Sequence, residues 1–378
     1  MIILKKAVLP RGFKANGIAC GLKKAGKLDL ALFYSSIPAN AACVFTTNKV
    51  IAAPLKLNKR YLKNNSKFQA ILVNSANANC LTGKVGLRDA QESAKSVSYA
   101  LKIKEESVLV NSTGIIGRRL DIAKIKDAIS GLVSGLSLKG LAQAEKAIMT
   151  TDKFVKEAAV KFDIRGKSVT VCAVAKGAGM ISPKMATLLC FIMTDANIPS
   201  VILKKALKES VDKSFNCITV DGCMSTNDSV MALANGEAGN KLIKGGNDYV
   251  NFVKVLSYVC LELAKAVVRD GEGATKFIEI TVDKAKNARD AKTAALAIAN
   301  SNLFKTAVYG KNPNFGRIFA AVGSCGIDVD EGLLKCRVSS LKKKDIKVYV
   351  EINKGVGRAV VYTSDLTPEY IKINAEYN

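Results

Sequence analysis

Segments rich in β-branched residues alternate with segments of helical periodicity along this chain, and this alternation limits the folds open to it. In the first half, strands and amphipathic helices are expected in mixed order. The strands are at residues 68–74, 107–111, 168–175 and 187–194, and the helices are at residues 87–103, 121–135, 138–149 and 200–211. Such an order indicates an α/β or α+β protein.

The second half continues the mixed pattern. The expected elements are two helices, a strand, a third helix and two further strands, at residues 228–235, 248–268, 276–282, 287–301, 346–352 and 358–363. The turn Gly271-Glu272-Gly273 interrupts this pattern after the second helix, which places a domain boundary near residue 275. We therefore expect a large body over residues 1–275 and a smaller C-terminal α/β domain over residues 276–378.

Histidine is absent from all 378 residues, and its absence excludes several kinds of catalytic site. Ser-His-Asp triads, Cys-His dyads and histidine metal ligands are ruled out. The ten cysteines contain no C-x-x-C pair, so no metal site is expected. A general base in this chain must be a carboxylate, a lysine with a lowered pKa, or an α-amino group.

The chain is strongly basic, with 57 Lys and Arg against 32 Asp and Glu and a net charge of +25. This charge suits nucleic acid, anionic small substrates, or solubility alone. Because the basic residues are dispersed and only 6% of residues are aromatic, we expect no nucleic-acid partner. No apolar run approaches the roughly 18 residues of a membrane span, and the first residues do not resemble a secretory signal. We expect a cytoplasmic protein without membrane contact.

A glycine-rich loop and a proline stand directly before a threonine that opens an apolar strand, within residues 176–189. The pattern alone is ambiguous, because glycine-rich loops often precede strands and this one lacks the spacing of a nucleotide-binding loop. Without histidine, a hydroxyl nucleophile can still be activated by its own α-amino group, provided that Thr187 becomes an N-terminus. Cleavage between Ala186 and Thr187 through an N-to-O acyl shift would produce that N-terminus.

This block resembles the cleavage-site signature of the glutamate N-acetyltransferase (ornithine acetyltransferase) family of arginine biosynthesis, which ends in Met-Ala-Thr. Nine further stretches resemble family motifs, in order, across the whole chain. They are Pro10–Phe13, Phe45–Asn48, Asn74–Asn79 with Thr82–Gly83, Asn111–Gly117, Thr150–Asp152, Asp221–Gly222 with Ser225–Asp228, Arg269–Lys276, Asn312–Arg317 and Ile373–Tyr377.

The resemblance implies a two-chain enzyme made from one precursor, with an alpha chain of residues 1–186 and a beta chain of residues 187–378. Thr187 would take acetyl from N-acetylornithine as an ester and pass it to glutamate. The implied fold is a layered αββα body of the N-terminal-nucleophile kind, with intertwined chains and a smaller C-terminal domain. Two such units would form an α₂β₂ heterotetramer. No cofactor is implied, and acetyl-CoA stays open as a second acetyl donor.

The motif matches also imply roles for single residues. Thr113 and Gly114 match the pair that forms the oxyanion hole, and the substrate-binding positions are matched by Thr151, Lys176, Thr187, Glu272 and Asn374. The charge of Lys176 suits an α-carboxylate, and that of Glu272 suits an ammonium group. Without the resemblance, these residues would be interpreted as ordinary turn and loop positions, and Asn374 as part of a frayed tail.

The chain departs from the family pattern at a few positions. Ser182, Lys184 and Cys223–Met224 replace residues that are more common in the family, and the family's terminal threonine has no counterpart after Asn378.

Two other classes of protein stay open. One is an N-terminal-nucleophile amidohydrolase or aminopeptidase on a related scaffold, and the other is a basic interaction protein without catalytic activity.

Overall fold

The computed structural model describes residues 1–24, 26–182 and 188–376. Contacts within the chain divide it into two units, and each is described by itself. The first unit contains Met1–Gly177, Thr187–Ser214 and Ser225–Leu263, and the second contains Ala178–Ala186, Phe215–Met224 and Ala264–Asn378. This division falls inside a helix, and the boundary expected near residue 275 stays a prediction.

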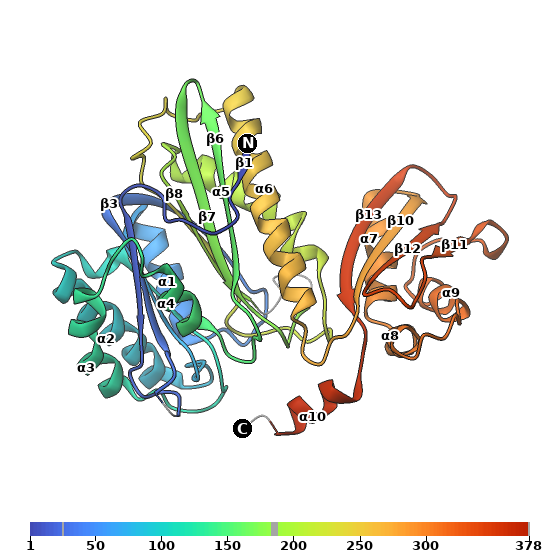
Figure 1. Ribbon diagram of the computed structural model, residues 1–378, viewed down its shortest axis with the longest axis horizontal. Coiled ribbons are helices and arrows are strands. Elements are labelled where there is room, and N and C mark those ends of the chain that lie inside the picture. Colours follow the sequence, from blue (N-terminus) through green and yellow to red (C-terminus); the bar gives the residue numbers. More distant parts are fainter. Residues whose placement is uncertain (25, 183–187, 377–378) are drawn as a thin grey trace. The chain divides into compact units, whose positions relative to one another are not determined.

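A nine-stranded sheet forms the centre of the first unit (Figure 1). Its strands are β1 (Ile2–Ile3), β2 (Phe13–Ile18), β3 (Leu30–Phe45), β4 (Lys67–Asn74), β5 (Val108–Ser112), β6 (Lys156–Ile164), β7 (Lys167–Lys176), β8 (Leu189–Thr194) and β9 (Ser229–Ala234). They follow the order β1-β6-β7-β8-β9-β3-β4-β5, with β2 beside β3. The sheet is mixed, because β4–β5 and β8–β9 are parallel pairs whereas the other pairs are antiparallel.

The long strand β3 connects the two parts of this sheet. Its first half pairs with β2 and β4, and its second half pairs with β9. The register with β4 shifts between Tyr34 and Ala39, around Pro38, which has no N–H to donate. The sheet folds onto itself there, since Phe33 of β3 contacts Phe191 of β8 with ring centroids 5.2 Å apart. Both rings are fully buried, so the core lies between the two parts of the sheet.

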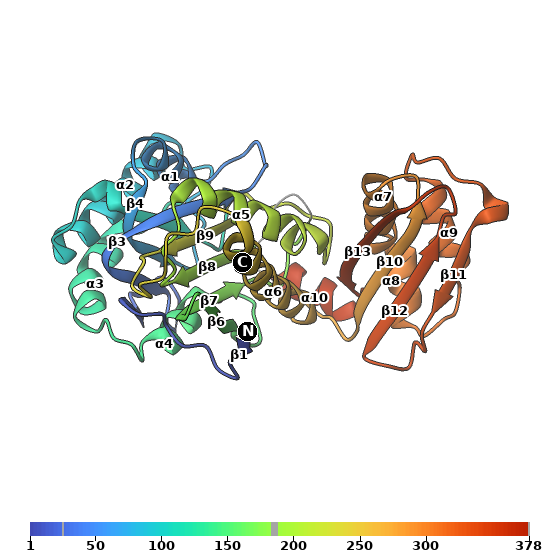
Figure 2. The ribbon, with the colours of Figure 1, turned by 90° about the horizontal axis from the view of Figure 1, so that it is seen from above.

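Helices cover the outer sides of the folded sheet. They are α1 (Ala53–Asn64), α2 (Gly83–Leu101), α3 (Ile122–Ser134), α4 (Leu141–Ile148), α5 (Ser200–Asp212) and α6 (Gly246–Arg269). The buried residues Ala90, Ala94 and Val97 form an apolar face on α2, and α6 packs on β6 through Phe252 and Phe162. Figure 1 and Figure 2 show α2 and α3 on the opposite side of the strands from α6. The layers are therefore helix, sheet, sheet and helix, which confirms the expected mixed α/β class.

A separate four-stranded sheet, in the order β11-β12-β10-β13, forms the centre of the second unit. Its strands are β10 (Phe277–Ala285), β11 (Lys335–Val338), β12 (Asp345–Glu351) and β13 (Gly357–Ser364), and its helices are α7 (Ala288–Ala299), α8 (Asn302–Tyr309), α9 (Gly316–Gly323) and α10 (Pro368–Glu376). Alternate residues of β10, among them Ile278 and Ile280, share a buried core with Ala291 and Ile298 of α7.

Most elements expected from the sequence are present within a few residues, but the helix expected at residues 228–235 is wrong. This segment is strand β9. All six of its residues are buried between β3 and β8, so it lacks the alternation of apolar and polar residues that marks a half-exposed strand. A continuous apolar run of this length does not distinguish a strand from a buried helix.

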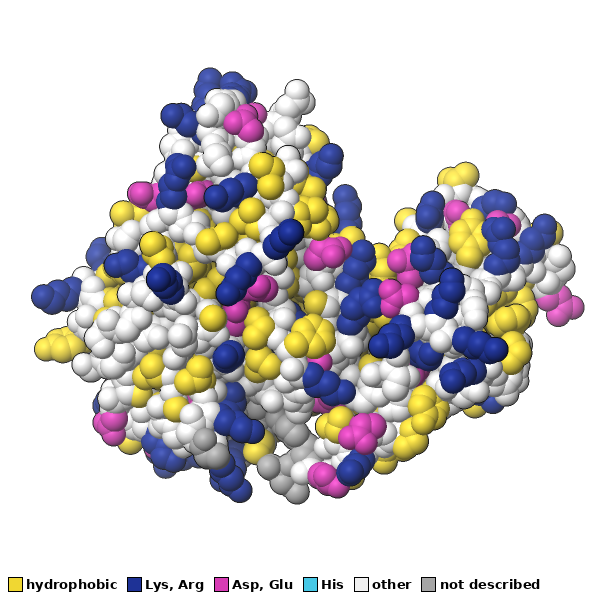
Figure 3. All heavy atoms as spheres, viewed as in Figure 1, with side chains coloured by type: hydrophobic (Ala, Val, Ile, Leu, Met, Phe, Trp, Pro, Cys, Tyr) yellow, Lys and Arg dark blue, Asp and Glu magenta, His cyan; other side chains and the backbone are white. Residues whose placement is uncertain are grey.

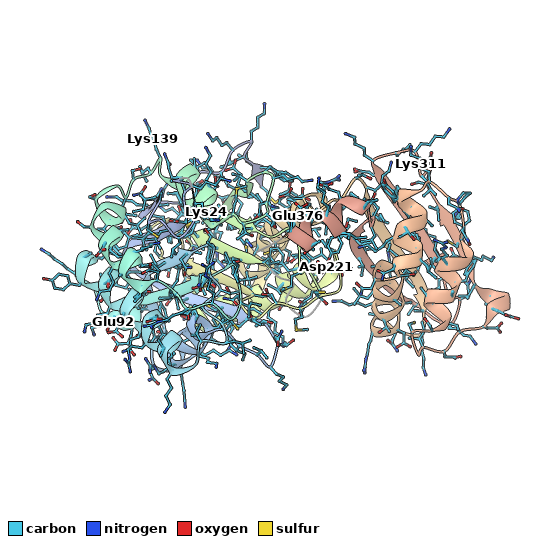
Figure 4. All side chains as sticks on the ribbon, turned by 90° about the horizontal axis from the view of Figure 1, so that it is seen from below. Lys24, Glu92, Lys139, Asp221, Lys311 and Glu376 are labelled. Atoms are coloured by element: carbon cyan, nitrogen blue, oxygen red, sulfur yellow. The ribbon has the colours of Figure 1, made fainter. Side chains whose placement is uncertain are left out.

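Basic side chains are scattered over the surface shown in Figure 3, without a single dominant patch. Lys139 in the first unit and Lys311 in the second both extend away from the ribbon (Figure 4). None of the helices that the structure describes combines the length and the apolar composition needed to cross a bilayer.

Candidate functional site

Thr113 and Gly114 follow β5 directly, in a turn that buried asparagine side chains support. The Thr113 N–H donates to the backbone carbonyl of Asn74 at 3.0 Å, and the Ser112 hydroxyl donates to Asn74 Oδ1 at 2.5 Å. The Asn227 amide donates to the Ser112 carbonyl at 2.8 Å. Backbone groups that are shielded from water need such partners, so the asparagines fix the course of the chain through this turn.

Gly114 occupies a position that no other residue type fits. Its φ is +133°, and a Cβ built on it would lie 2.2 Å from the carbonyl carbon of Ala76. Both the backbone conformation and the lack of space therefore require glycine. The close approach of the two backbones keeps the turn narrow directly beside Thr113.

Lys176 is the last residue of β7, and only 5% of it is exposed. Its Nζ donates to the Thr113 hydroxyl at 3.1 Å, which joins two candidate residues 63 positions apart in sequence. In the sheet, Lys176 is the register partner of Leu189, the first residue of β8. The ammonium group therefore belongs to the end of the sheet at which the chain enters β8.

The carboxylate of Asp152 binds the backbone next to Lys176. It accepts hydrogen bonds from the Gly177 N–H at 2.7 Å, from Lys156 Nζ at 2.6 Å and from the Thr150 N–H at 2.9 Å. Burial would raise the pKa of Asp152, but the neighbouring ammonium groups of Lys176 and Lys156 lower it to about 2. Asp152 is therefore ionised at neutral pH.

A second buried carboxyl group, that of Asp228, lies directly before β9. Only 1% of the residue is exposed, and neither carboxyl oxygen has a hydrogen bond among the described residues. Burial raises the pKa of Asp228 well above its usual range, although the nearby Ser225 hydroxyl and Lys176 ammonium lower it to a smaller extent. Burial therefore favours the neutral form of this carboxyl group, which lies near the positive charge of Lys176.

We expect Asp228→Asn to raise the midpoint of thermal unfolding at pH 8 and to leave it nearly unchanged at pH 4. In the unfolded chain the pKa of Asp228 is about 3.9, whereas the folded chain retains the proton to a higher pH. Wild type therefore loses stability as the pH rises from the pKa of Asp228 in the unfolded chain to its pKa in the folded chain. The asparagine amide does not titrate in this range, so the variant does not show this loss. Calorimetry at several pH values tests this, with Asp127→Asn at an exposed position of α3 as the control. Parallel curves for wild type and Asp228→Asn would contradict the prediction.

Glu272 and Asn374 meet in the second unit. The Asn374 amide, on α10, donates to Glu272 Oε2 at 2.9 Å and to the Tyr370 carbonyl at 3.0 Å. Glu272 lies in the turn after α6, and its own N–H donates to the Ala178 carbonyl at 2.9 Å. Asn374 is thus part of a helix and does not belong to a frayed tail.

The structure brings the predicted site residues together in two groups. Thr113, Gly114 and Lys176 form one group in the first unit, where Thr151 directly precedes Asp152; Glu272 and Asn374 form the other group in the second unit. Ala186 and Thr187 lie outside the described residues. Sequence reasoning assigned no role to the residues around Thr113 and Lys176, namely Asp152, Lys156, Asn227 and Asp228. For three of them the signal is their place in the motifs Thr150–Asp152 and Ser225–Asp228.

The fold and the site define a mixed α/β protein in which a buried ammonium group, a hydroxyl group and two acids lie near the ends of strands of one sheet. The sequence matches the model of the ArgJ family over residues 14–342. The chain belongs to the ArgJ family.

Individual relatives are similar over nearly the whole chain. The arginine biosynthesis bifunctional protein ArgJ of Caldanaerobacter subterraneus subsp. tengcongensis is 45% identical, over 98% of this chain and 98% of its own. The glutamate N-acetyltransferase of Methanocaldococcus jannaschii is 46% identical, over 97% of each chain. Among solved structures, the arginine biosynthesis bifunctional protein argJ of Bacillus halodurans is 39% identical with a TM-score of 0.47, covering 49% of this chain and 97% of that chain.

Proposed function

We propose that this chain is a glutamate N-acetyltransferase of arginine biosynthesis that moves acetyl from N-acetylornithine to glutamate. Membership of the ArgJ family supports this activity, as do the names of the similar proteins. In the structure, the observation that carries the proposal is the buried hydrogen bond between Lys176 and Thr113, beside the start of β8.

The proposed reaction begins with the cleavage of the precursor. The Thr187 hydroxyl attacks the Ala186 carbonyl carbon, the acyl group moves from nitrogen to oxygen, and water hydrolyses the resulting ester. The released α-amine of Thr187 then accepts the hydroxyl proton as the oxygen attacks the acetyl group of N-acetylornithine. Ornithine leaves, and the amine of glutamate attacks the acetyl ester to give N-acetylglutamate and restore Thr187.

Thr113 and Gly114 are proposed to stabilise the oxyanion of each tetrahedral intermediate. A hydroxyl group has one proton to donate and two lone pairs that accept. Because the Thr113 oxygen accepts from Lys176, its own proton remains for donation to another group. Lys176 therefore orients and polarises this donor, and the loss of one such donor typically costs a factor of about 10²–10³ in rate.

The charges near Lys176 favour an anionic ligand. The ammonium groups of Lys176 and Lys156 lie beside the carboxylate of Asp152, and burial favours the neutral form of Asp228. Both proposed substrates have an α-carboxylate, which such a site attracts.

In the second unit, Glu272 is proposed to bind a substrate ammonium group, and Asn374 is proposed to hold the Glu272 carboxylate in place. Thr151 is proposed to contact substrate on the basis of its motif.

Several further properties are part of the proposal. The cleaved chains assemble as a cytoplasmic α₂β₂ heterotetramer, and the reaction uses no cofactor. Acetyl-CoA stays open as a second donor. Comparing N-acetylglutamate formation from acetyl-CoA plus glutamate with its formation from N-acetylornithine plus glutamate decides this question.

Mass spectrometry of products and protein tests the proposal. The purified protein should consist of fragments of 186 and 192 residues (378 − 186 = 192), and N-acetylornithine alone should add one acetyl group to the fragment that begins at Thr187. N-acetylglutamate should form only when glutamate is also present. If N-acetylornithine is consumed equally fast without glutamate, the protein is a hydrolase and the proposed transfer is wrong.

A further inference from the structure

The side chain of Asp221, in the second unit, accepts hydrogen bonds from three separate parts of the chain. Oδ2 accepts from the Met180 N–H at 2.7 Å and from the Tyr370 hydroxyl at 3.2 Å. Oδ1 accepts from the Ile181 N–H at 2.9 Å and from the Cys223 N–H at 3.0 Å. A carboxylate with four donors fixes the position of all the segments that supply them.

One of these segments leads toward the proposed cleavage point. Ile181 is fully buried, and its carbonyl accepts from the Val220 N–H at 3.0 Å and from the Thr219 hydroxyl at 3.1 Å. The Ala178 carbonyl accepts from the Glu272 N–H. Residues 178–181 are thus bound to the second unit on both sides of Met180, shortly before the chain reaches Thr187.

The loop that presents Asp221 is itself held by a buried lysine. Lys305, on α8, is 2% exposed and donates to the Val220 carbonyl and, at 3.3 Å, to the Thr363 hydroxyl. Burial lowers the pKa of Lys305 to about 8, and the negative charges of Asp221 and Asp365 oppose this effect. Movement of the loop would leave the buried ammonium group without these partners, which is costly.

The other segment bound to Asp221 is α10. Tyr370 and Asn374 are four residues apart and therefore lie on the same face of this helix. Tyr370 bonds to Asp221, and Asn374 bonds to Glu272. Burial and the neighbouring Asp221 carboxylate raise the pKa of the Tyr370 hydroxyl, which keeps it protonated as a donor. The bond from Tyr370 thus fixes the rotation at which α10 presents Asn374.

We propose that Asp221 is a positioning residue for two steps of the proposed function, on which this inference rests. It holds Met180 and Ile181 so that the precursor cleaves before Thr187. It also holds α10 through Tyr370 so that Asn374 and Glu272 bind an amino-acid substrate. One carboxylate thereby places the chain for cleavage and for substrate binding.

Two variants of the full-length protein distinguish the effect of Asp221 on cleavage from its effect on substrate binding. Asp221→Asn is expected to slow cleavage of newly made precursor about tenfold, and to raise the KM for N-acetylornithine after cleavage while kcat stays within about twofold. Tyr370→Phe removes only the bond to α10, so KM should rise about three- to tenfold with cleavage unchanged. Amide hydrogen exchange should quicken at Met180, Ile181 and α10 in Asp221→Asn, but only at α10 in Tyr370→Phe.

Two matched controls separate these effects from a general loss of stability. Asp195 also accepts from two backbone N–H groups, those of Thr170 and Arg11, and Tyr249 donates to Glu209 at 2.7 Å between α5 and α6. Asp195→Asn and Tyr249→Phe should keep the wild-type cleavage rate and KM.

The proposal about Asp221 and the proposed function fail in different ways. The role of Asp221 is overturned if Asp221→Asn keeps the wild-type cleavage rate and KM. It is also overturned if Tyr370→Phe cleaves as slowly as Asp221→Asn. A wild-type protein that stays uncleaved or transfers no acetyl overturns the proposed function. In that case, amide hydrogen exchange still tests the positioning role. Exchange at Met180 and Ile181 that is as slow in Asp221→Asn as in wild type would reject the role, and faster exchange at these residues would support it.

Discussion

Thr187→Ala is expected to remain a single chain of 40.3 kDa and to lose acetyl transfer by a factor of about 10⁴ or more. In the proposed mechanism, cleavage and transfer both need the Thr187 hydroxyl, and transfer also needs the α-amine that cleavage releases. The two functions should therefore fail together. Intact mass and the rate of N-acetylglutamate formation, measured on the same preparation, check both.

Thr187→Ser is the matched control for this variant, because it keeps a hydroxyl group at the same position. It should retain part of both cleavage and transfer. Cleavage of Thr187→Ala at the same bond would show that another group is the nucleophile. Transfer at the wild-type rate by the uncleaved variant would show that the α-amine is not the base.

Lys176→Met is expected to lower kcat/KM for N-acetylornithine by about 10²-fold, since hydrogen bonds to charged groups contribute about 1.5–3 kcal/mol each. Methionine keeps the unbranched shape of the side chain but removes the ammonium group that donates to Thr113 and attracts a carboxylate. Lys167→Met is the control, because Lys167 is exposed at the opposite end of the same strand. Steady-state kinetics on cleaved protein, with calorimetry to confirm folding, measures the effect. Equal kcat/KM in both variants would remove Lys176 from the proposed mechanism.

The elements that were predicted well from the sequence have a clear periodicity of apolar residues, and their tertiary contacts do not override it. The apolar face of α2 is an example, with Ala90, Ala94 and Val97 at helical spacing. Strand β3 was not predicted, because Ser35, Ser36 and Pro38 interrupt it and only its different partners in the two halves keep it extended. Burial on both faces likewise removed the alternation that would have identified β9.

The site was predicted from family motifs and not from the pattern of elements. The pattern of helices and strands does not indicate that Lys176 and Thr113 meet, because their contact depends on how β5 and β7 are placed within one sheet. The raised pKa of Asp228 and the lowered pKa of Asp152 could not be predicted either. Burial and neighbouring charges set both shifts, and these appear only when distant segments pack together.

The strand order determines how the proposed cleavage before residue 187 would affect the pairing of the strands. In the order β7-β8-β9-β3, the middle two strands belong to residues after the division, and the outer two belong to residues before it. Each piece alone would leave the edges of central strands unpaired, so neither is expected to fold without the other. Unfolding of the cleaved protein then releases two molecules from one, and its midpoint should rise with protein concentration. The midpoint of the uncleaved Thr187→Ala chain should change less over the same range of concentration.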